Sequence, residues 1–223
     1  MNKNIVMVGA GVANVNAATK LVDEGYNGKI TIIDMGKDPY LRPYEEVMTG
    51  FLGAGGWSDG KLTYHTSIGG QLSKYCGEEK AMELFDQVID NFKRFHPKPE
   101  EVQCSNPIAE PDFIKPYFGL RLFPVWHVGT DYLHEIGKNW YDYLVSKGVK
   151  FEWEAKVTSI DFENQTGTVI VLQSDLTHTF EYDRLIFGVG KSGIDFGKQL
   201  AEKYELPTEP KPVQIGVRFE APQ

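Results

Sequence analysis

The stretch NIVMVGAGVANVNAATKLVDEGYNGKITIIDM, residues 4–35, decides the fold. Residues 4–10 form a short, β-branched apolar run, which is typical of a buried parallel strand. Residues 12–25 carry apolar side chains at helical spacing, and Gly25 stands where a helix end favours positive φ. A second β-branched strand, residues 29–35, contains Asp34 near its end. Strand, glycine turn, helix, strand and acid together predict a nucleotide-binding βαβ unit.

The spacing of this unit indicates how a dinucleotide would bind. Gly9 permits a tight turn, and Gly11 lets a pyrophosphate approach the backbone at the positive end of the helix. Asp34 is placed to accept hydrogen bonds from a ribose hydroxyl pair, which disfavours a 2′-phosphate. The alternative is an α/β turn that binds no phosphate.

Asn14 departs from the dinucleotide fingerprint, because it stands where a third glycine is usual. A side chain here occupies the position where helix and strand normally pack closest. Two interpretations follow: the helix stands off slightly, or the Asn14 amide contacts the ligand itself.

Composition excludes several classes of partner. The formal net charge is -8, which argues against a nucleic-acid partner. Cys76 and Cys104 are spaced for neither a metal nor a redox site, so we expect free thiols in a reducing compartment and no metal. The apolar run at residues 5–12 is too short to span a bilayer and lacks a signal-peptide layout. We therefore expect a cytoplasmic protein without a membrane partner.

The second half of the chain favours one crossover type. A helix is expected over residues 131–147, with Thr130 and Asp131 as its cap and Leu133, Ile136, Trp140 and Leu144 on one face. Short strands follow up to an apolar strand at residues 184–190 that ends in glycines. NAD-type domains usually cross with a helix here, whereas two-dinucleotide flavoprotein folds use a β-meander. The predicted class is α/β: a Rossmann-like FAD/NAD(P)-binding fold, with a parallel sheet, a β-meander crossover and an insertion of helix and loop.

Four blocks of the chain resemble one known family. They are GFLGAGGWSDGKLTYHTSIGG (50–70), HVGTDYL (127–133), LIFGVGKSG (185–193) and EPKPVQIGVRFEAPQ (209–223). In this order they are similar to blocks of the largely uncharacterised bacterial family of FAD-dependent dehydrogenases, and the likeness covers essentially the whole chain. The resemblance implies FAD as cofactor, oxidoreductase activity, and a glutathione-reductase-type FAD-binding fold with a second, substrate-facing domain.

The resemblance also implies positions for the cofactor. FAD would place its pyrophosphate at Gly9 and Gly11 and its ribose at Asp34. Its adenine would lie against the backbone near Val157, and the last strand would pass the cofactor at two glycines, Gly188 and Gly190.

The loop from Gly53 to Lys61 is expected to wrap the ribityl chain and the flavin ring, since side chains on Gly53, Gly55, Gly56 and Gly60 would collide with the ring. We expect positive φ at Gly55 in particular. Ser58 and Asp59 are candidates to bond ribityl hydroxyls. The alternative is a purely structural glycine-rich turn.

Three residues are candidates for chemistry, each with a plainer alternative. Lys61 lies near the flavin N1/C2 edge, where a cation favours the reduced anion, or is a solvated lysine. His65 and His127 are proton carriers or structural histidines. We take Lys61 and His65 as the candidate catalytic pair.

The chain divides into three expected parts: residues 1–70 form the first part of the FAD-binding domain, residues 71–126 form an insertion, and residues 127–223 form the second part of that domain and the start of a missing substrate domain. The insertion contains an amphipathic helix over 78–95 and a non-periodic, proline-rich segment that covers the substrate side of the flavin. Arg121 in this segment is either an anion contact for substrate or paired with a surface acid.

Chains of the resembled family continue for a comparable length beyond the 209–223 block. We therefore expect a truncated or split product, a fragment with a partner chain, or a shorter variant. The expected reactants are a small-molecule substrate and NAD(P)H or another electron donor. Two other functions stay open: an NAD-dependent dehydrogenase of plain Rossmann type, and a non-catalytic FAD-binding partner subunit.

Overall fold

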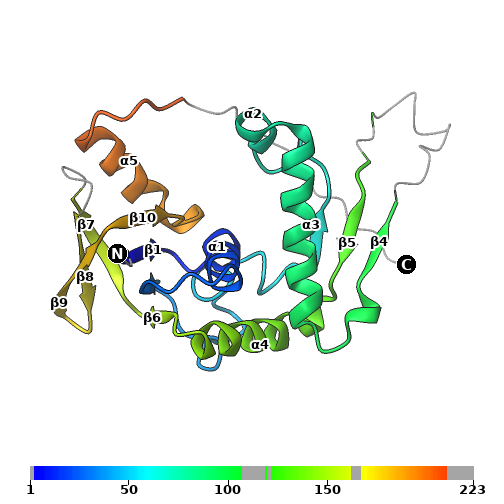
Figure 1. Ribbon diagram of the computed structural model, residues 1–223, viewed down its shortest axis with the longest axis horizontal. Helices are drawn as coiled ribbons and strands as arrows, with labels where there is room; N and C mark the ends of the chain where they lie inside the picture. Colours follow the sequence, from blue (N-terminus) through cyan, green and yellow to red (C-terminus); the bar gives the residue numbers. More distant parts are fainter. Residues whose placement is uncertain (1–2, 107–118, 120–121, 162–166, 210–223) are drawn as a thin grey trace.

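The computed structural model, which describes residues 3–106, 119, 122–161 and 167–209, contains a four-stranded parallel sheet, which lies in the left half of Figure 1. The strand order is β10-β1-β2-β6. The strands are β1 (Ile5–Val8), β2 (Ile30–Ile33), β6 (Lys150–Glu152) and β10 (Arg184–Phe187). The predicted α/β class with a parallel sheet is confirmed.

Strand β1 is an inner strand of the parallel sheet and is buried on both faces. Ile5 and Met7 pack into one apolar cluster, whereas Val6 and Val8 pack into another. Helix α1 (Val12–Asp23) returns the chain from β1 to β2 and covers the first face. Gly25 follows the helix with φ of 78°, the left-handed backbone conformation in which many α-helices end.

The crossover from β6 to β10 is a meander of three antiparallel strands, as the sequence predicts. Its strands are β7 (Lys156–Ile160), β8 (Gly167–Gln173) and β9 (Leu176–Tyr182), paired in the order β7-β8-β9. The meander covers the second face of the parallel sheet together with α5 (Ile194–Lys203), which follows a 3-10 turn, η3 (Lys191–Gly193). Most of the turn expected at 164–167 lies outside the described residues.

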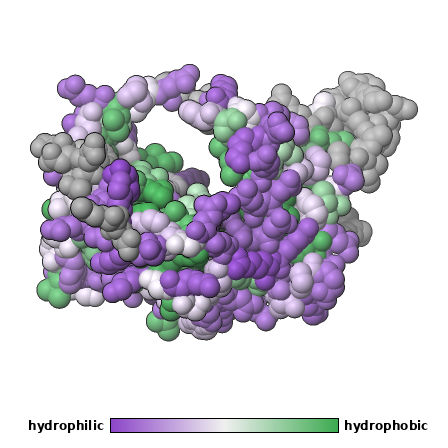
Figure 2. All heavy atoms as spheres, viewed as in Figure 1, coloured by the Kyte–Doolittle hydropathy of each residue, from purple (hydrophilic) through white to green (hydrophobic). Residues whose placement is uncertain are grey.

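Two further helices pack beside α1. Helix α3 (Glu78–Phe95), which short α2 (Leu72–Cys76) precedes, has the predicted bounds. It buries Ile89, Phe92 and Phe95, whereas its apolar residues Met82, Phe85 and Val88 are only partly buried. Figure 2 shows that the outer surface around α3 is largely hydrophilic and that the molecule is hollowed between α2 and α5.

Helix α4 (Leu133–Ser146) buries the four predicted apolar residues. The expected cap is wrong: Thr130 and Asp131 belong to a one-turn 3-10 helix, η2 (Thr130–Tyr132), and neither η2 nor α4 has a side-chain cap. Gly129, with φ of 73°, starts this turn. A 3-10 turn that leads directly into the α-helix takes the place of the cap.

One further sheet, besides the parallel sheet and the meander, was not predicted. It consists of β3 (Lys61–Thr63), β5 (Val125–His127) and β4 (Gln103–Ser105), in the order β3-β5-β4, with a 3-10 turn, η1 (Pro99–Glu101), before β4. Strands of three residues are too short to show an alternating pattern. The expected boundary between residues 126 and 127 falls inside β5, and the three-part division stays a prediction.

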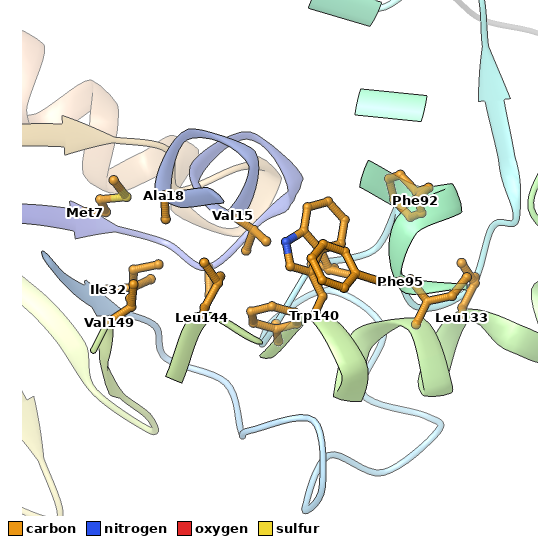
Figure 3. Packing of buried hydrophobic residues seen from close by; sticks show 14 of the residues in the cluster. Met7, Val15, Ala18, Ile32, Phe92, Phe95, Leu133, Trp140, Leu144 and Val149 are labelled. Atoms are coloured by element: carbon orange, nitrogen blue, oxygen red, sulfur yellow. The ribbon is translucent and has the colours of Figure 1, made fainter. Parts of the chain in front are cut away.

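Trp140 of α4 is the centre of the larger core (Figure 3). Its ring stacks on Phe95 with centroids 4.9 Å apart and meets Phe92 edge-on at 5.4 Å. The buried Trp140 Nε1 donates to Thr19 Oγ1 at 2.7 Å, and Thr19 donates in turn to the Val15 carbonyl. The hydrogen bond to Thr19 satisfies the buried indole N–H and fixes α1 against α4.

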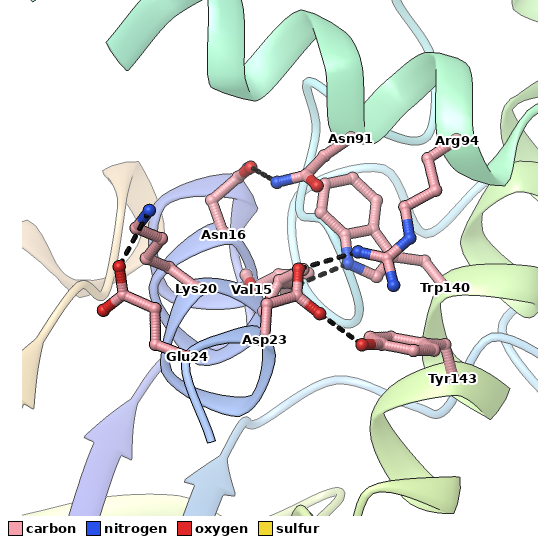
Figure 4. Close-up of polar contacts among 10 residues, drawn as sticks. Val15, Asn16, Lys20, Asp23, Glu24, Asn91, Arg94, Trp140 and Tyr143 are labelled. Atoms are coloured by element: carbon pink, nitrogen blue, oxygen red, sulfur yellow. Dashed lines mark hydrogen bonds and ion pairs between the residues drawn. The ribbon is translucent and has the colours of Figure 1, made fainter. Parts of the chain in front are cut away.

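A polar contact strengthens the same junction at the far end of α1 (Figure 4). Asp23 accepts a hydrogen bond from Arg94 of α3 at 2.7 Å and one from the Tyr143 hydroxyl of α4. Residues of three helices, α1, α3 and α4, therefore meet at one carboxylate.

In the described part of the chain, no helix has the length and apolar character needed to cross a membrane. Cys76 and Cys104 are free thiols, as expected.

Candidate nucleotide site

The turn from β1 to α1 needs glycine because another turn lies directly against it. Gly9 has φ of 96°, and a Cβ on it would lie 2.3 Å from the Gly188 carbonyl oxygen. Its N–H donates to the Ile33 carbonyl at 2.7 Å. Gly9 and Gly188 thus let the ends of adjacent strands β1 and β10 approach closely.

Gly11 has a different surrounding. It is the N-cap of α1 in extended conformation, and a Cβ on it would meet nothing within 4 Å. No side chain caps α1, and its first turn carries no acid. The positive end of the helix therefore borders open space beside a residue without a side chain.

Asn14, which replaces the third glycine of the fingerprint, has its side chain buried inside the protein. It is 2% exposed, and its Nδ2 donates to the Val8 carbonyl at 3.0 Å and the Gly9 carbonyl at 2.8 Å. Its Oδ1 would lie 2.6 Å from a Cβ on Gly188. Both amide protons are used inside the chain, so Asn14 joins the strand end, the turn and the helix.

Asp34 organises the mouth of the site. Its Oδ2 accepts the Ala10 N–H at 2.7 Å, and its Oδ1 accepts the N–H groups of Gly36 at 2.7 Å and Gly50 at 2.8 Å. A carboxylate has about four acceptor positions. The three backbone donors therefore leave about one position, on Oδ2, for a ligand.

A cavity of about 440 Å³ opens beside Asp34. It brings together Gly9, Asp34 and Val157, which come from three separate regions of the chain. Val189, between Gly188 and Gly190, also lines it. The remaining walls combine apolar and polar groups: Val8, Ile33, Met35, Met48, Thr49, Ala155, Lys156, Thr158, Ser192, Gly193, Asp195, Phe196 and Gln199.

Val157 presents an unusual stretch of backbone to this cavity. It lies on β7, the outer strand of the meander, and pairs with Val171 of β8 on one side only. The register shifts between Val157 and Ser159. An outer strand with an irregularity leaves backbone polar groups available to a ligand.

The glycine-rich loop lies against the β1–α1 turn. The Leu52 N–H donates to the Ala10 carbonyl at 2.7 Å, and a Cβ on Gly53 would lie 3.6 Å from Gly11 Cα. Leu52 and Gly53 both have positive φ, at 62° and 55°. The loop thus continues the surface that Gly11 begins.

The loop glycines differ in what requires them. A Cβ on Gly56 would lie 2.3 Å from Leu52 Cβ, and one on Gly60 would lie 2.6 Å from Thr130 N, so packing explains both. Gly55 is exposed, and a Cβ on it would come no closer than 3.8 Å to Val12 Cγ2. The expectation of positive φ at Gly55 is wrong. Gly190, with φ of 59°, also borders open space.

The other candidates lie away from the cavity wall. Ser58 and Asp59 are exposed, and Ser58 Oγ bonds the Ala54 carbonyl at 3.2 Å within its own turn. Lys61 of β3 is exposed and pairs with His127 of β5.

The exposed His65 ring contacts Phe123 at 4.9 Å, and its Nδ1 lies 2.8 Å from Ser67 Oγ. Neither Lys61 nor His65 lines the cavity, and their part in catalysis stays a prediction. Arg121 and all but Glu209 of the 209–223 block lie outside the described residues.

Sequence reasoning missed Arg42. This residue is 5% exposed, and its guanidinium lies 4.2 Å over the Trp57 ring. Burial lowers its pKa to about 10, against the opposing effect of Asp34 and Glu46. An arginine beside a proline in a polar loop has no pattern that predicts burial.

No protein-family model and no curated protein sequence matches the chain. Its fold is similar to that of a flavoprotein/dehydrogenase from Cytophaga hutchinsonii, with a TM-score of 0.52 and 18% identity, over 95% of this chain and 44% of that one. It is also similar to p-nitrophenol 4-monooxygenase PnpA from Pseudomonas putida DLL-E4, with a TM-score of 0.50 and 12% identity, over 88% and 43%. At such identities the likeness concerns the fold alone, and the chain spans less than half the length of either protein.

Proposed function

We propose that the chain binds FAD and forms the FAD-binding part of an oxidoreductase. One observation carries the proposal: a single cavity gathers Gly9, Asp34 and Val157. The spacing of the βαβ unit assigns Gly9 to the pyrophosphate and Asp34 to the ribose, and the family resemblance implies Val157 as the neighbour of the adenine. A cavity of about 440 Å³ is within the range of small-ligand sites, which starts at about 300 Å³.

The adenosine half of FAD fits the charges and donors of this cavity. The free acceptor position of Asp34 would take a ribose hydroxyl, and the open side of β7 at Val157 would take the edge of the base. The uncapped start of α1 at Gly11 suits the pyrophosphate, because helix N-termini attract anions.

The flavin half fits the bare backbone that continues from the turn into the loop. Gly11, Gly53 and Gly55 follow one another along this surface, and none meets protein atoms closer than 3.6 Å where a Cβ would stand. A flat ring can lie on such a surface without a side chain in its way. Bound FAD would supply electron transfer between a donor, such as NAD(P)H, and a small-molecule substrate.

The meander argues against the alternative of a plain NAD-binding domain. Between β6 and β10 the chain forms β7, β8 and β9 where an NAD-type domain usually places a helix. A non-catalytic FAD-binding subunit is separated from an oxidoreductase by turnover: reduction of a dye by the protein with NAD(P)H supports the enzyme. We also propose that a further segment or a partner chain completes the substrate side of the site.

The test is to identify the bound chromophore. The protein is purified, its absorbance spectrum recorded, and the ligand released by denaturation and weighed by mass spectrometry. Colourless protein is titrated with FAD, FMN and NAD in parallel. FAD is the expected ligand. Release of FMN, or failure of the folded protein to take up FAD, contradicts the proposal.

A further inference from the structure

Arg42 is buried and forms no direct ion pair with an acid among the described residues, although the charges of Asp34 and Glu46 favour its protonated form. Each of its guanidinium bonds goes to a backbone carbonyl: Nε to Glu46 at 2.7 Å, Nη1 to Phe51 at 2.8 Å, and Nη2 to Val47 at 2.7 Å and Gly53 at 3.4 Å. Burying a charge is costly unless hydrogen bonds replace its water. Because all four hydrogen bonds of the guanidinium go to backbone carbonyls, Arg42 fixes the path of the chain over residues 46–53.

The path that Arg42 fixes contains a strained residue. Phe51 and Gly53, two of its acceptors, are the direct neighbours of Leu52. Leu52 is 1% exposed and has φ of 62°, a left-handed conformation that is unfavourable for a bulky L-residue. Such a conformation persists only where the surroundings hold it.

Leu52 in turn places the loop. In its left-handed conformation it donates to the Ala10 carbonyl at 2.7 Å, and the next residue, Gly53, lies against Gly11. From the other side, the Trp57 ring packs under the Arg42 guanidinium and stacks on the His134 ring, with centroids 3.8 Å apart. The guanidinium thus lies between the backbone of Phe51 and Gly53 and the ring of Trp57.

We infer that Arg42 is a positioning residue: its fork of donors holds Leu52 and Gly53 beside Gly11 and so builds the surface that receives the flavin ring. This inference rests on the proposed function. It assigns Arg42 to the flavin half of the site, and Arg42 itself does not line the adenosine cavity.

The experiment compares two ligands on the apoprotein, FAD and ADP, by isothermal titration. In Arg42→Met we expect FAD affinity to fall about tenfold or more, as loss of about 1.4 kcal/mol or more requires, while ADP affinity stays within about twofold. Arg42→Lys keeps the charge but lacks the fork, and we expect it to restore little of the FAD affinity. Arg94→Met, which removes an arginine that pairs with Asp23 on the far side of α1, is the matched control and should change neither affinity.

Each outcome of the titrations supports or overturns the inference. An equal loss of ADP and FAD affinity in Arg42→Met would mean a general structural role and would overturn the inference, as would unchanged FAD affinity. Full recovery by Arg42→Lys would overturn the role of the fork. If Arg42→Met does not fold, Arg42→Lys alone tests the inference by the same two ligands. Wild-type protein that binds ADP but not FAD would refute the proposed function itself, and the inference with it.

Discussion

Asp34 and Arg42 bind the same four-residue stretch of backbone, Gly50–Gly53, one through its donors and the other through its acceptors. The Asp34 carboxylate accepts the Gly50 N–H at 2.8 Å. The Arg42 guanidinium donates to the Phe51 carbonyl at 2.8 Å and, more weakly, to the Gly53 carbonyl at 3.4 Å. The acid at the mouth of the cavity and the buried cation therefore act on one loop, and a change at Asp34 affects the loop as well as the ligand.

Asp34→Ala should weaken the binding of ADP by roughly 1–3 kcal/mol, the size of a lost charge-assisted hydrogen bond. It should also destabilise the ligand-free protein, because the N–H groups of Ala10, Gly36 and Gly50 lose their acceptor. Isothermal titration measures the first effect and urea unfolding the second. Asp90→Ala, at an exposed position on α3, is the control, and unchanged ADP affinity in Asp34→Ala would place the ribose elsewhere.

Gly55 offers a probe of the flavin surface that leaves the fold intact. Gly55→Ala should change the free energy of unfolding by no more than about 0.5 kcal/mol, because its φ is not positive and a Cβ meets nothing closer than 3.8 Å. Gly53→Ala should cost about 1–2 kcal/mol, because φ is 55° at Gly53. Urea unfolding of the two variants checks the contrast, and equal losses would contradict it.

The same position tests where the flavin ring lies. Gly55→Val should greatly weaken FAD binding while ADP binding stays, because a branched side chain would stand on the ring surface. Titration of the apoprotein with both ligands is the measurement. A folded Gly55→Val protein that binds FAD as the wild type does would show that the loop is only a structural turn.

Thr19 carries a hydrogen bond in the core that can be removed at nearly constant shape. Thr19→Val should lower the free energy of unfolding by about 1–3 kcal/mol, because Trp140 Nε1 loses its acceptor at 2.7 Å. Thr19→Ser keeps the hydroxyl and should lose less. Urea denaturation of both variants checks the order, and a Thr19→Val protein more stable than Thr19→Ser would refute it.

His134 should make stability depend on pH. Burial lowers its pKa below the usual 6.5, as do the charges of Arg42 and Lys138, while the hydrogen bond to the Trp57 carbonyl opposes the shift. The unfolded chain therefore binds its proton at higher pH than the folded chain does. Stability falls as pH drops below 6.5 and levels off below the folded pKa.

Replacing His134 by Phe tests this pH dependence, because the ring can still stack on Trp57. We expect a smaller difference between urea midpoints measured on either side of pH 6.5 in this variant than in the wild type. His178→Phe, at an exposed position on β9, should leave the difference as it is. A His134→Phe protein with the full wild-type difference would assign the effect to other groups.

The parts of the fold that sequence could predict are those with long or regular patterns. The strands β1 and β2 are continuous β-branched runs, whereas the 18-residue helix α3 and the seven-residue strands β8 and β9 are long enough to show a period. The sheet β3-β5-β4 has strands of three residues, which carry no period. Its pairing depends on contacts between segments far apart in the sequence, so tertiary structure alone decides it.

The site divides in the same way. Gly9 and Asp34 follow from spacing, because the chemistry of a phosphate and a ribose requires particular residues at particular strand ends. Val157 follows from a family resemblance only. Arg42 and the strained Leu52 follow from neither, since burial of a charge and positive φ at a leucine arise from how the loop is packed.

The central strand has a consequence for synthesis of the chain. β1 needs β10 as a neighbour, and the hydrogen bond from the Asn4 N–H to Asp183 beside this pair spans 179 residues. At about 5–20 residues per second, a ribosome needs on the order of ten to forty seconds between the two strands. During that time an apolar strand that is buried on both faces in the finished protein waits with one edge unpaired. N-terminal domains usually fold as they leave the ribosome. This nucleotide site, at the ends of β1 and β10, can form only after β10 has left the ribosome as well.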